Sequence, residues 1–264
     1  MIVSVQDPAD PTIAAYRDVR ERDLVGRDGL FIAEGEVVLR CLIRSERCET
    51  LSLLLLERQA ERLEPMLADL PPEVPVYVAS QAVMDAIVGF PIHRGILALG
   101  RRPAEPAPAE LLAGLPRRAV VVCLFGIANH DNMGGLLRNA AAFGVDAVLL
   151  DSDCCDPLYR KAIRVSVGAA LLTPFVRLAP GADVLGLLEG AGFQPLALSP
   201  AGERTLAETL RPDRVAVLLG AEGPGLSPQL MARAETVRIP MAGGFDSLNV
   251  ATTGGIVLHH LTSQ

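Results

Sequence analysis

The sequence predicts an α/β protein that is built from two domains on either side of a linker. Short apolar runs alternate with amphipathic stretches along most of the 264 residues, as strands alternate with helices in layered α/β domains. Residues 101–117 are rich in proline and alanine, which is typical of a semi-rigid spacer. Half of the residues are hydrophobic, so the chain can fill a sizeable core.

Before the spacer, residues 1–100 are expected to form a small mixed α/β domain. Residues 29–34 read as a strand that leads into a helix, and Ser80 is a suitable N-cap for a later helix. The strands are expected over residues 29–34, 50–56, 74–78 and 95–100, and the helices over residues 11–21, 36–44, 58–69 and 80–87.

After the spacer, residues 118–264 repeat the alternation more strongly. Residues 119–125 form a continuous apolar run, which is the pattern of a parallel strand buried on both faces. Further strands are expected over residues 147–150, 173–176, 194–198, 215–219 and 237–239, and helices over residues 133–143, 158–165, 184–190 and 247–261.

Composition and charge narrow the possible functions. The formal net charge is −7, which counts against non-specific binding of nucleic acid. Of the 24 basic residues only Lys161 is a lysine. Arginine suits bidentate phosphate contacts, although a GC-rich genome would also enrich it, and that reading carries more weight. Aromatic residues make up 4% of the chain, so base stacking is not expected to be the main mode of RNA binding.

Cysteine and histidine give no metal-site pattern. The five cysteines include the adjacent pair Cys154 and Cys155, which cannot easily chelate one metal, and no pair has zinc-ligand spacing. We read all five as reduced thiols of a cytoplasmic protein. The histidines are read as structural or solvated; they are His93, His130, His259 and His260. No signal peptide and no membrane-spanning stretch are expected.

The first candidate motif is the segment 129–140, which follows a buried strand and opens a helix. Loops at the carboxyl ends of parallel strands are the usual ligand sites of such sheets. Asn132 is expected to cap the helix, while Gly134 and Gly135 allow a close approach of the backbone. Arg138 would reach the same loop. A capped helix with a solvated Arg138 is the alternative.

The second and third motifs also follow predicted strands. Residues 220–226 read Gly-Ala-Glu-Gly-Pro-Gly-Leu, which matches neither a dinucleotide fingerprint nor a P-loop. Its only charged residue is Glu222, and a plain glycine-rich turn is the alternative. Residues 239–251 lead from a short strand into the last helix, where Ser247 is a good N-cap. Asn249 in the first turn of this apolar helix needs hydrogen-bond partners if it is buried.

Taken in this order, the three motifs resemble those of the SpoU/TrmH family of RNA ribose 2′-O-methyltransferases in the SPOUT superfamily. The matching residues are Asn132, Gly134 and Arg138 in the first motif, Gly220, Glu222 and Gly223 in the second, and residues 239–241 and 247–250 in the third. The chain departs from the common pattern at Asn129 and His130, where many members have Asp-Pro, and at Ala251, where many have Ser. These departures concern the subfamily rather than the activity.

The resemblance implies a fold, a cofactor and a dimer. The C-terminal domain would be a parallel-sheet domain with a deep knot, and it would form a homodimer. The smaller N-terminal domain would bind the RNA substrate, with residues 31–35 and 93–97 resembling the family's substrate-binding domain. S-adenosylmethionine would lie in the knotted loops, in contact with Leu198, Gly220, Ile239 and Leu248.

The resemblance also assigns catalytic roles, to Asn132, Arg138, Glu222, Ser247 and Asn249. Arg138 would bind a neighbouring RNA phosphate and stabilise the alkoxide that develops on the ribose, because an arginine side chain stays protonated in proteins. Asn132 would orient Arg138 or the ribose, and the other three residues would fix the loops. His130 and Asp131 are expected to be bystanders.

A basic cluster lies between the first two motifs. Arg160, Lys161 and Arg164 precede Ser166-Val-Gly168, and we expect them to contact RNA phosphates, with a solvated helix face as the alternative. The function expected overall is S-adenosylmethionine-dependent 2′-O-methylation of a structured RNA, more readily ribosomal RNA than transfer RNA. A non-catalytic RNA-binding protein of the same fold and a metabolic enzyme for a small molecule are the other hypotheses.

Overall fold

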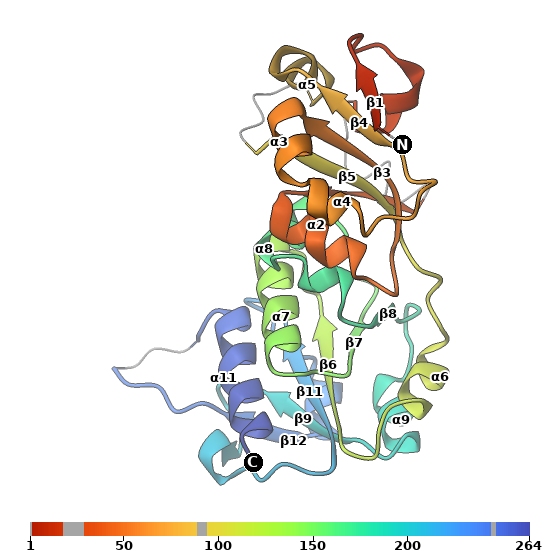
Figure 1. The fold of residues 1–264 in the computed structure, drawn as a ribbon. Coiled ribbons are helices and arrows are strands. Elements are labelled where there is room, and N and C mark those ends of the chain that lie inside the picture. Colours follow the sequence, from red (N-terminus) through yellow and green to blue (C-terminus); the bar gives the residue numbers. More distant parts are fainter. Residues whose placement is uncertain (1, 18–28, 89–93, 244–246) are drawn as a thin grey trace. The chain divides into compact units, whose positions relative to one another are not determined.

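The computed structural model describes residues 2–17, 29–88, 94–243 and 247–264, and these fold into two compact units (Figure 1). The first unit combines residues 1–103 with residues 156–172, and the second combines residues 104–155 with residues 173–264. The segment 156–172 therefore packs with the mainly N-terminal unit, although it lies within the sequence range 118–264 that we expected to form the second domain.

The first unit is built on a mixed five-stranded sheet. Strands β1, β4 and β3 are parallel, and β5 runs antiparallel to both β3 and β2. In sheet order the strands are β1 (Ile2–Val5), β4 (Val76–Ala79), β3 (Glu49–Leu56), β5 (Ile96–Arg101) and β2 (Leu30–Glu34). The run Leu53–Leu56 in β3 is buried, because helices cover the sheet at its centre. Strand β1 was not expected from the sequence.

Short helices surround this sheet. They are η1 (Pro11–Tyr16), α2 (Glu36–Ile43), α3 (Glu57–Arg62), α4 (Glu64–Leu67), α5 (Gln81–Val88), α8 (Arg160–Val165) and η3 (Ala169–Leu171). The helix expected over residues 58–69 is broken at Leu63, because Pro65 lacks the backbone N–H that would continue it. Ser80 accepts a hydrogen bond from Val83 N at 3.4 Å, as expected of an N-cap. Within the helix expected over residues 11–21, the structure has the 3₁₀ helix η1, which ends at Tyr16. Residues 18–21 of the expected helix lie outside the described residues.

The segment 156–172 is attached to the first unit by specific contacts with α2. Cys41 Sγ donates a weak hydrogen bond to Val167 O at 3.7 Å, and Ser45 Oγ donates to Leu171 O at 2.7 Å. Gly168 has φ +86°, and a Cβ at this position would lie 2.8 Å from Cys41. Only glycine fits both this conformation and this spacing, so the chain can run close along α2.

The second unit is built on a seven-stranded sheet in which every pairing is parallel. This confirms the α/β fold class with a parallel sheet. In sheet order the strands are β10 (Arg204–Thr205), β12 (Glu235–Arg238), β9 (Gln194–Leu198), β11 (Arg214–Gly220), β6 (Ala119–Phe125), β7 (Ala147–Leu150) and β8 (Phe175–Arg177). The central strands β11 and β6 are buried on both faces. The knot implied by the resemblance stays a prediction.

Helices cover both faces of this sheet. They are α6 (Pro108–Ala113), α7 (His130–Ala142), α9 (Val184–Gly190), η4 (Leu206–Glu208), α10 (Pro228–Ala232) and α11 (Val250–Thr262). Helices α7 and α11 lie side by side on one face, and α6 and α9 lie on the other (Figure 1). A Cβ on Gly135 would lie 2.8 Å from the Cβ of Ala251, so small residues allow α7 and α11 to approach closely. Helix α6 lies within the segment expected to be a linker.

Candidate active site

Three loops at the carboxyl ends of neighbouring strands enclose a cavity in the second unit. Leu198 ends β9, Gly220 ends β11, and Ile239 directly follows β12. The cavity has a volume of about 440 Å³, within the range of roughly 300–1,000 Å³ that is usual for small-molecule and cofactor pockets. The four residues expected to contact a cofactor all line it, together with Ser247, Glu222 and Asn249.

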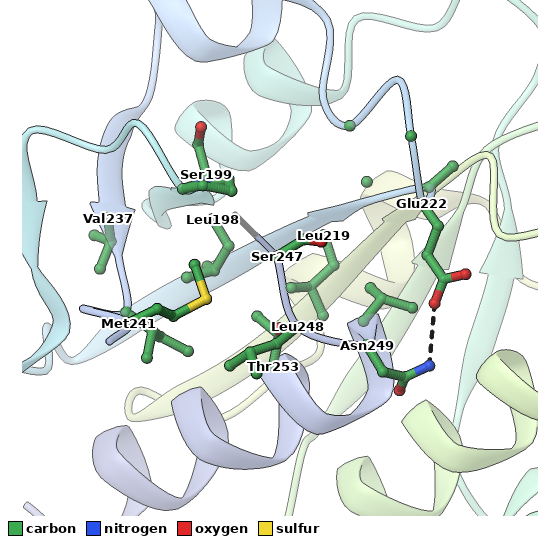
Figure 2. A pocket seen from close by; sticks show the side chains of 17 residues that line it. Leu198, Ser199, Leu219, Glu222, Val237, Met241, Ser247, Leu248, Asn249 and Thr253 are labelled. Atoms are coloured by element: carbon green, nitrogen blue, oxygen red, sulfur yellow. Dashed lines mark hydrogen bonds between the residues drawn. The ribbon is translucent and has the colours of Figure 1, made fainter. Parts of the chain in front are cut away.

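The lining of the cavity is mainly apolar, and Glu222 and Asn249 lie at one end of it (Figure 2). Its side chains include those of Leu219, Val237, Met241, Leu248 and Thr253. Figure 2 shows Glu222 and Asn249 side by side at the edge of this apolar space. The sequence analysis included Met241 in the third motif without giving it a role, and it did not single out Thr253. Thr253 lies one helical turn after Asn249, so helical spacing alone could have indicated it.

The glycine-rich loop after β11 folds back tightly on itself. Ala221 and Gly225 form an isolated antiparallel bridge, in which Gly225 N donates to Ala221 O at 3.0 Å. A Cβ on Gly220 would lie 2.4 Å from the carbonyl carbon of Gly225 and 2.6 Å from Leu226 N. Both are backbone atoms, which cannot move aside cheaply, so this wall of the cavity requires glycine at position 220.

Asn132, Glu222 and Asn249 form a closed hydrogen-bonded cluster, which we call the polar triad. Asn249 Nδ2 donates to Asn132 Oδ1 at 2.7 Å and to Glu222 Oε1 at 3.0 Å, and Asn132 Nδ2 donates to Glu222 Oε1 at 3.1 Å. The three side chains come from α7, from the loop after β11 and from the start of α11. Three motifs that are far apart in the sequence therefore meet at one end of the cavity.

The structure corrects two helix starts that we expected from the sequence. Helix α11 begins after Asn249 rather than at Ser247: Asn249 Oδ1 accepts hydrogen bonds from Ala251 N and Thr252 N at 3.0 and 3.2 Å. Helix α7 is capped by Asn129 rather than Asn132. Several residues in each segment are good caps, so composition alone could not choose among them. As a result the Asn132 side chain is available to the polar triad.

The other two predicted catalytic residues, Ser247 and Arg138, are not part of the polar triad. Ser247 lines the cavity. Arg138 is exposed on α7 and does not line the cavity, and among the described residues its guanidinium has no hydrogen-bond or ion-pair partner. Asn132 is bonded to Glu222 and Asn249 rather than to Arg138. The catalytic role of Arg138 stays a prediction.

A second loop, residues 151–155, bonds to the segment that connects β6 to α7. Gly126 N donates to Asp151 Oδ2 at 2.9 Å, and Ile127 N donates to Cys154 Sγ at 3.3 Å. Arg177 Nη1 donates to the carbonyl oxygens of Asp151 and Cys154, both at 2.9 Å. Burial, reinforced by the neighbouring Asp151 carboxylate, raises the pKa of the Cys154 thiol to about 12. The thiol therefore stays protonated at neutral pH and fits a structural role.

Of the predicted RNA-binding residues, Arg138 lies in the second unit and the basic cluster lies in the first. Arg160, Lys161 and Arg164 are all on α8, which packs against β2. Lys161 and Arg164 are exposed, and Arg160 is half-buried. The sequence analysis identified this cluster but placed it in the C-terminal domain, residues 118–264.

The described part of the chain has no grouping of metal-ligand residues and no membrane-spanning helix. In the part of the chain that the structure describes, no three or more His, Cys, Asp or Glu residues are grouped so that they could hold a metal ion. No helix among the described residues is both long enough and apolar enough to span a membrane.

The SpoU rRNA Methylase family matches residues 119–259 of this chain. A protein of Mycobacterium bovis, named as an uncharacterized tRNA/rRNA methyltransferase, is 41% identical over an alignment of 270 residues, which covers 99% of this chain and 92% of that protein. The 23S rRNA (guanosine-2′-O-)-methyltransferase RlmB of Salmonella typhi is 31% identical over 218 residues, covering 81% of this chain and 89% of that protein.

A solved structure agrees with the fold. The SpoU methyltransferase AviRb of Streptomyces viridochromogenes, solved in complex with the cofactor AdoMet (S-adenosylmethionine), has a TM-score of 0.83 at 18% identity and covers 97% of this chain and 98% of its own. The parallel sheet, the cavity at its carboxyl edge and these relatives define the chain as a methyltransferase. It belongs to the SpoU rRNA methylase family, which confirms the family that its three motifs resemble.

Proposed function

We propose that this protein transfers a methyl group from S-adenosylmethionine to the 2′-hydroxyl of a ribose in structured RNA, with ribosomal RNA as the substrate. The observation that carries the proposal is the polar triad of Asn132, Glu222 and Asn249 at the edge of a largely apolar cavity of cofactor size. The relative RlmB, which is named for guanosine 2′-O-methylation of 23S rRNA, supports the choice of hydroxyl and of RNA.

The cavity fits the proposed cofactor. S-adenosylmethionine is a nucleoside with an amino-acid tail, so it needs apolar surface for its base and backbone groups for its polar atoms. Leu198, Ile239 and Leu248 supply apolar surface, and the loop that begins at Gly220 supplies backbone groups. When bound, the cofactor supplies an electrophilic methyl group together with its own leaving group.

The side chains of the chain then have to position the ribose and help to remove its proton. Glu222 Oε1 is held by both amides, whereas Glu222 Oε2 has no partner among the described residues. This second oxygen is free to accept a hydrogen bond from a ribose hydroxyl. Asn132 and Asn249 act as positioning residues for Glu222, and Ser247 shapes the cavity wall beside them.

Arg138 is proposed to bind an RNA phosphate and to stabilise the negative charge that develops on the ribose oxygen. A permanently charged guanidinium suits this role better than that of a base. Arg160, Lys161 and Arg164 are proposed to contact RNA phosphates away from the reacting ribose. A homodimer through the knotted C-terminal domain and a cytoplasmic location complete the proposal, following the family resemblance.

The decisive experiment maps 2′-O-methylated nucleotides in total RNA from cells with and without the gene. We expect one ribosomal position to lose its methyl group and to regain it with purified protein and S-adenosylmethionine. If a transfer RNA position changes instead, the substrate is transfer RNA, which the name of the Mycobacterium bovis relative also allows. If no position changes, and isothermal titration shows no binding of S-adenosylmethionine, the proposal is wrong.

The role of Arg138 has its own test. The substitution Arg138→Ala should lower methyl transfer by about 100-fold or more, since removing a charge-stabilising donor from an active site typically costs that much. Binding of S-adenosylmethionine should stay within about twofold of the wild type, because Arg138 does not line the cavity. Near-normal turnover of the variant would exclude Arg138 from catalysis.

A further inference from the structure

The segment that follows Asp156 is locally rich in positive charge. Residues 157–172 include three basic residues and no acidic one, whereas the whole chain has a formal net charge of −7. Asp156 itself forms an ion pair with Arg102. Lys161 and Arg164 are exposed one turn apart on α8. The segment therefore presents a local cationic surface on an acidic protein.

Helix α2 carries a second exposed cation. Positions 37, 40 and 44 share one side of the helix, because residues three and seven apart lie close in angle, and all three are exposed. Arg40 is ion-paired with Glu36 at 3.2 Å. Arg44 has no ion-pair partner among the described residues. Arg44 is thus the uncompensated charge on the outer side of α2.

These two cations flank a direct contact between α2 and the segment 156–172. Cys41 Sγ bonds to Val167 O at 3.7 Å, and Val167 N bonds to Arg164 O at 3.1 Å. Arg164 lies three residues before Val167, and Arg44 lies three residues after Cys41. Two parts of the chain that are more than a hundred residues apart therefore place Arg44 and Arg164 each three residues from the same contact on one unit.

Arg44 also borders a hollow on the same unit. The hollow has a volume of about 260 Å³ and is lined by α2, α3 and α4. Its other charged residues include Glu36 and Arg62, which pair with each other at 2.7 Å. Arg40 and Asp69 also line the hollow, and Arg40 shares the Glu36 carboxylate with Arg62. Arg44 is the arginine of this lining that has no ion-pair partner among the described residues.

We propose that α2 and α8 together form a phosphate-binding surface on the first unit, with Arg44 and Arg164 as its principal contacts to the backbone of the RNA substrate. This inference rests on the proposed function for the identity of the RNA. Arginine forks favour phosphate oxygens, and two such contacts position a nucleic acid without reading its sequence. An acidic protein can hold RNA in this way through a locally cationic face.

The test compares charge reversals in RNA binding. The variants are Arg44→Glu, Arg164→Glu and the double variant, and the control is Arg117→Glu. Arg117 is an exposed arginine of the second unit with a side chain 94% exposed, and it precedes β6 at the amino edge of the sheet, away from the cavity. The probe is deproteinised ribosomal RNA from cells that lack the gene, with dissociation constants measured between 50 and 200 mM salt.

We expect each single reversal to weaken binding by roughly 10-fold and to reduce the slope of log affinity against log salt by about one. The double variant should lose roughly 100-fold, and Arg117→Glu should match the wild type. Affinity for S-adenosylmethionine should not change. In a methylation assay KM for RNA should rise, while kcat at saturating RNA stays within about twofold.

The possible outcomes separate this inference from the proposed function. Binding of the double variant that equals that of Arg117→Glu, with an unchanged salt slope, would overturn the surface. If the double variant binds RNA more weakly but the wild-type protein methylates no RNA, the phosphate-binding surface is supported and the proposed function is wrong. Arg44→Gln and Arg164→Gln, which remove the charges without adding negative ones, give the same readout if a reversal prevents folding.

Discussion

Two groups of polar side chains, one in each unit, differ in whether their members bond to protein partners. In the second unit Asn132, Glu222 and Asn249 satisfy one another within 3.1 Å. In the first unit Arg44 and Arg164 are exposed and have no ion-pair partner among the described residues. Chemistry at one ribose requires groups that are fixed before the substrate arrives, whereas attraction of a phosphate backbone needs only charge in the right region. This difference fits a second unit that carries out methyl transfer and a first unit that binds RNA.

The arginines illustrate the same contrast. Arg177 donates to the carbonyl oxygens of Asp151 and Cys154, while Arg238 donates to those of Gly202 and Glu203. These arginines hold loops of the second unit in place and have fewer donors left for phosphates. A high arginine content is therefore not by itself a sign of RNA binding, because some of these arginines are occupied by internal partners.

The largest effect should follow from Gly220→Ala, which attacks the fixed site directly. The new Cβ would lie 2.4 Å from the backbone of Gly225, so the loop must move. We expect a loss of about 1–3 kcal/mol in the free energy of unfolding, and binding of S-adenosylmethionine should fall at least about 100-fold by calorimetry. Gly190→Ala is the matched control, because nothing lies within 4 Å of its Cβ position; equal behaviour of the two variants would contradict the tight-loop account.

Asn249→Asp should have the next largest effect. It separates the two roles of Asn249, which caps α11 and donates hydrogen bonds within the polar triad. The aspartate can still cap α11, and Asp and Asn are similar N-caps, so stability should change by less than about 1 kcal/mol. It replaces the amide donor to Asn132 and Glu222 with a carboxylate, which repels Glu222. We expect methyl transfer to fall at least about tenfold, equivalent to about 1.4 kcal/mol in the barrier. Full activity would show that only capping matters.

A smaller effect is expected from Arg177→Lys, which loosens the loop beneath α7. A lysine ammonium cannot reproduce the fork that reaches the carbonyls of Asp151 and Cys154. We expect a loss of about 1–2 kcal/mol in stability, measured by denaturant unfolding, and a several-fold lower kcat with unchanged cofactor affinity. The control Arg233→Lys changes an exposed arginine in surface ion pairs, and its effect should be close to zero.

At neutral pH the smallest effect is expected from Cys154, whose contribution is a pH dependence of stability in alkaline solution. Burial raises the pKa of Cys154 from 9.0 to about 12, so above pH 9 the unfolded chain loses this proton while the folded chain keeps it. Stability should therefore fall as pH rises from about 9 to about 12. Cys154→Ser keeps the hydrogen-bonding geometry without the titration, and it should show a shallower decline in unfolding free energy. Identical slopes for both proteins would refute this account.

The sequence predicted the site better than the domain boundaries. Each motif was placed at the end of a strand, and because parallel strands end at the same edge of a sheet, Glu222 and Asn249 could be expected to lie close together. Helix caps were less predictable, since neighbouring Asn and Ser residues compete for the same role. The position of the segment 156–172 could not be predicted, because it depends on contacts such as Cys41 with Val167, which are 126 residues apart.

The split first unit has a consequence for the order in which the protein can be completed. A ribosome releases residues 1–103 early, and domains tend to fold as they emerge. However, the side of α2 around Cys41 and Ser45 gains its final contacts only from Val167 and Leu171. Residues 1–103 therefore lack these contacts until the nascent chain has been synthesised beyond position 172. Dividing the gene at the proline-rich segment would yield an N-terminal fragment that lacks part of its own structure.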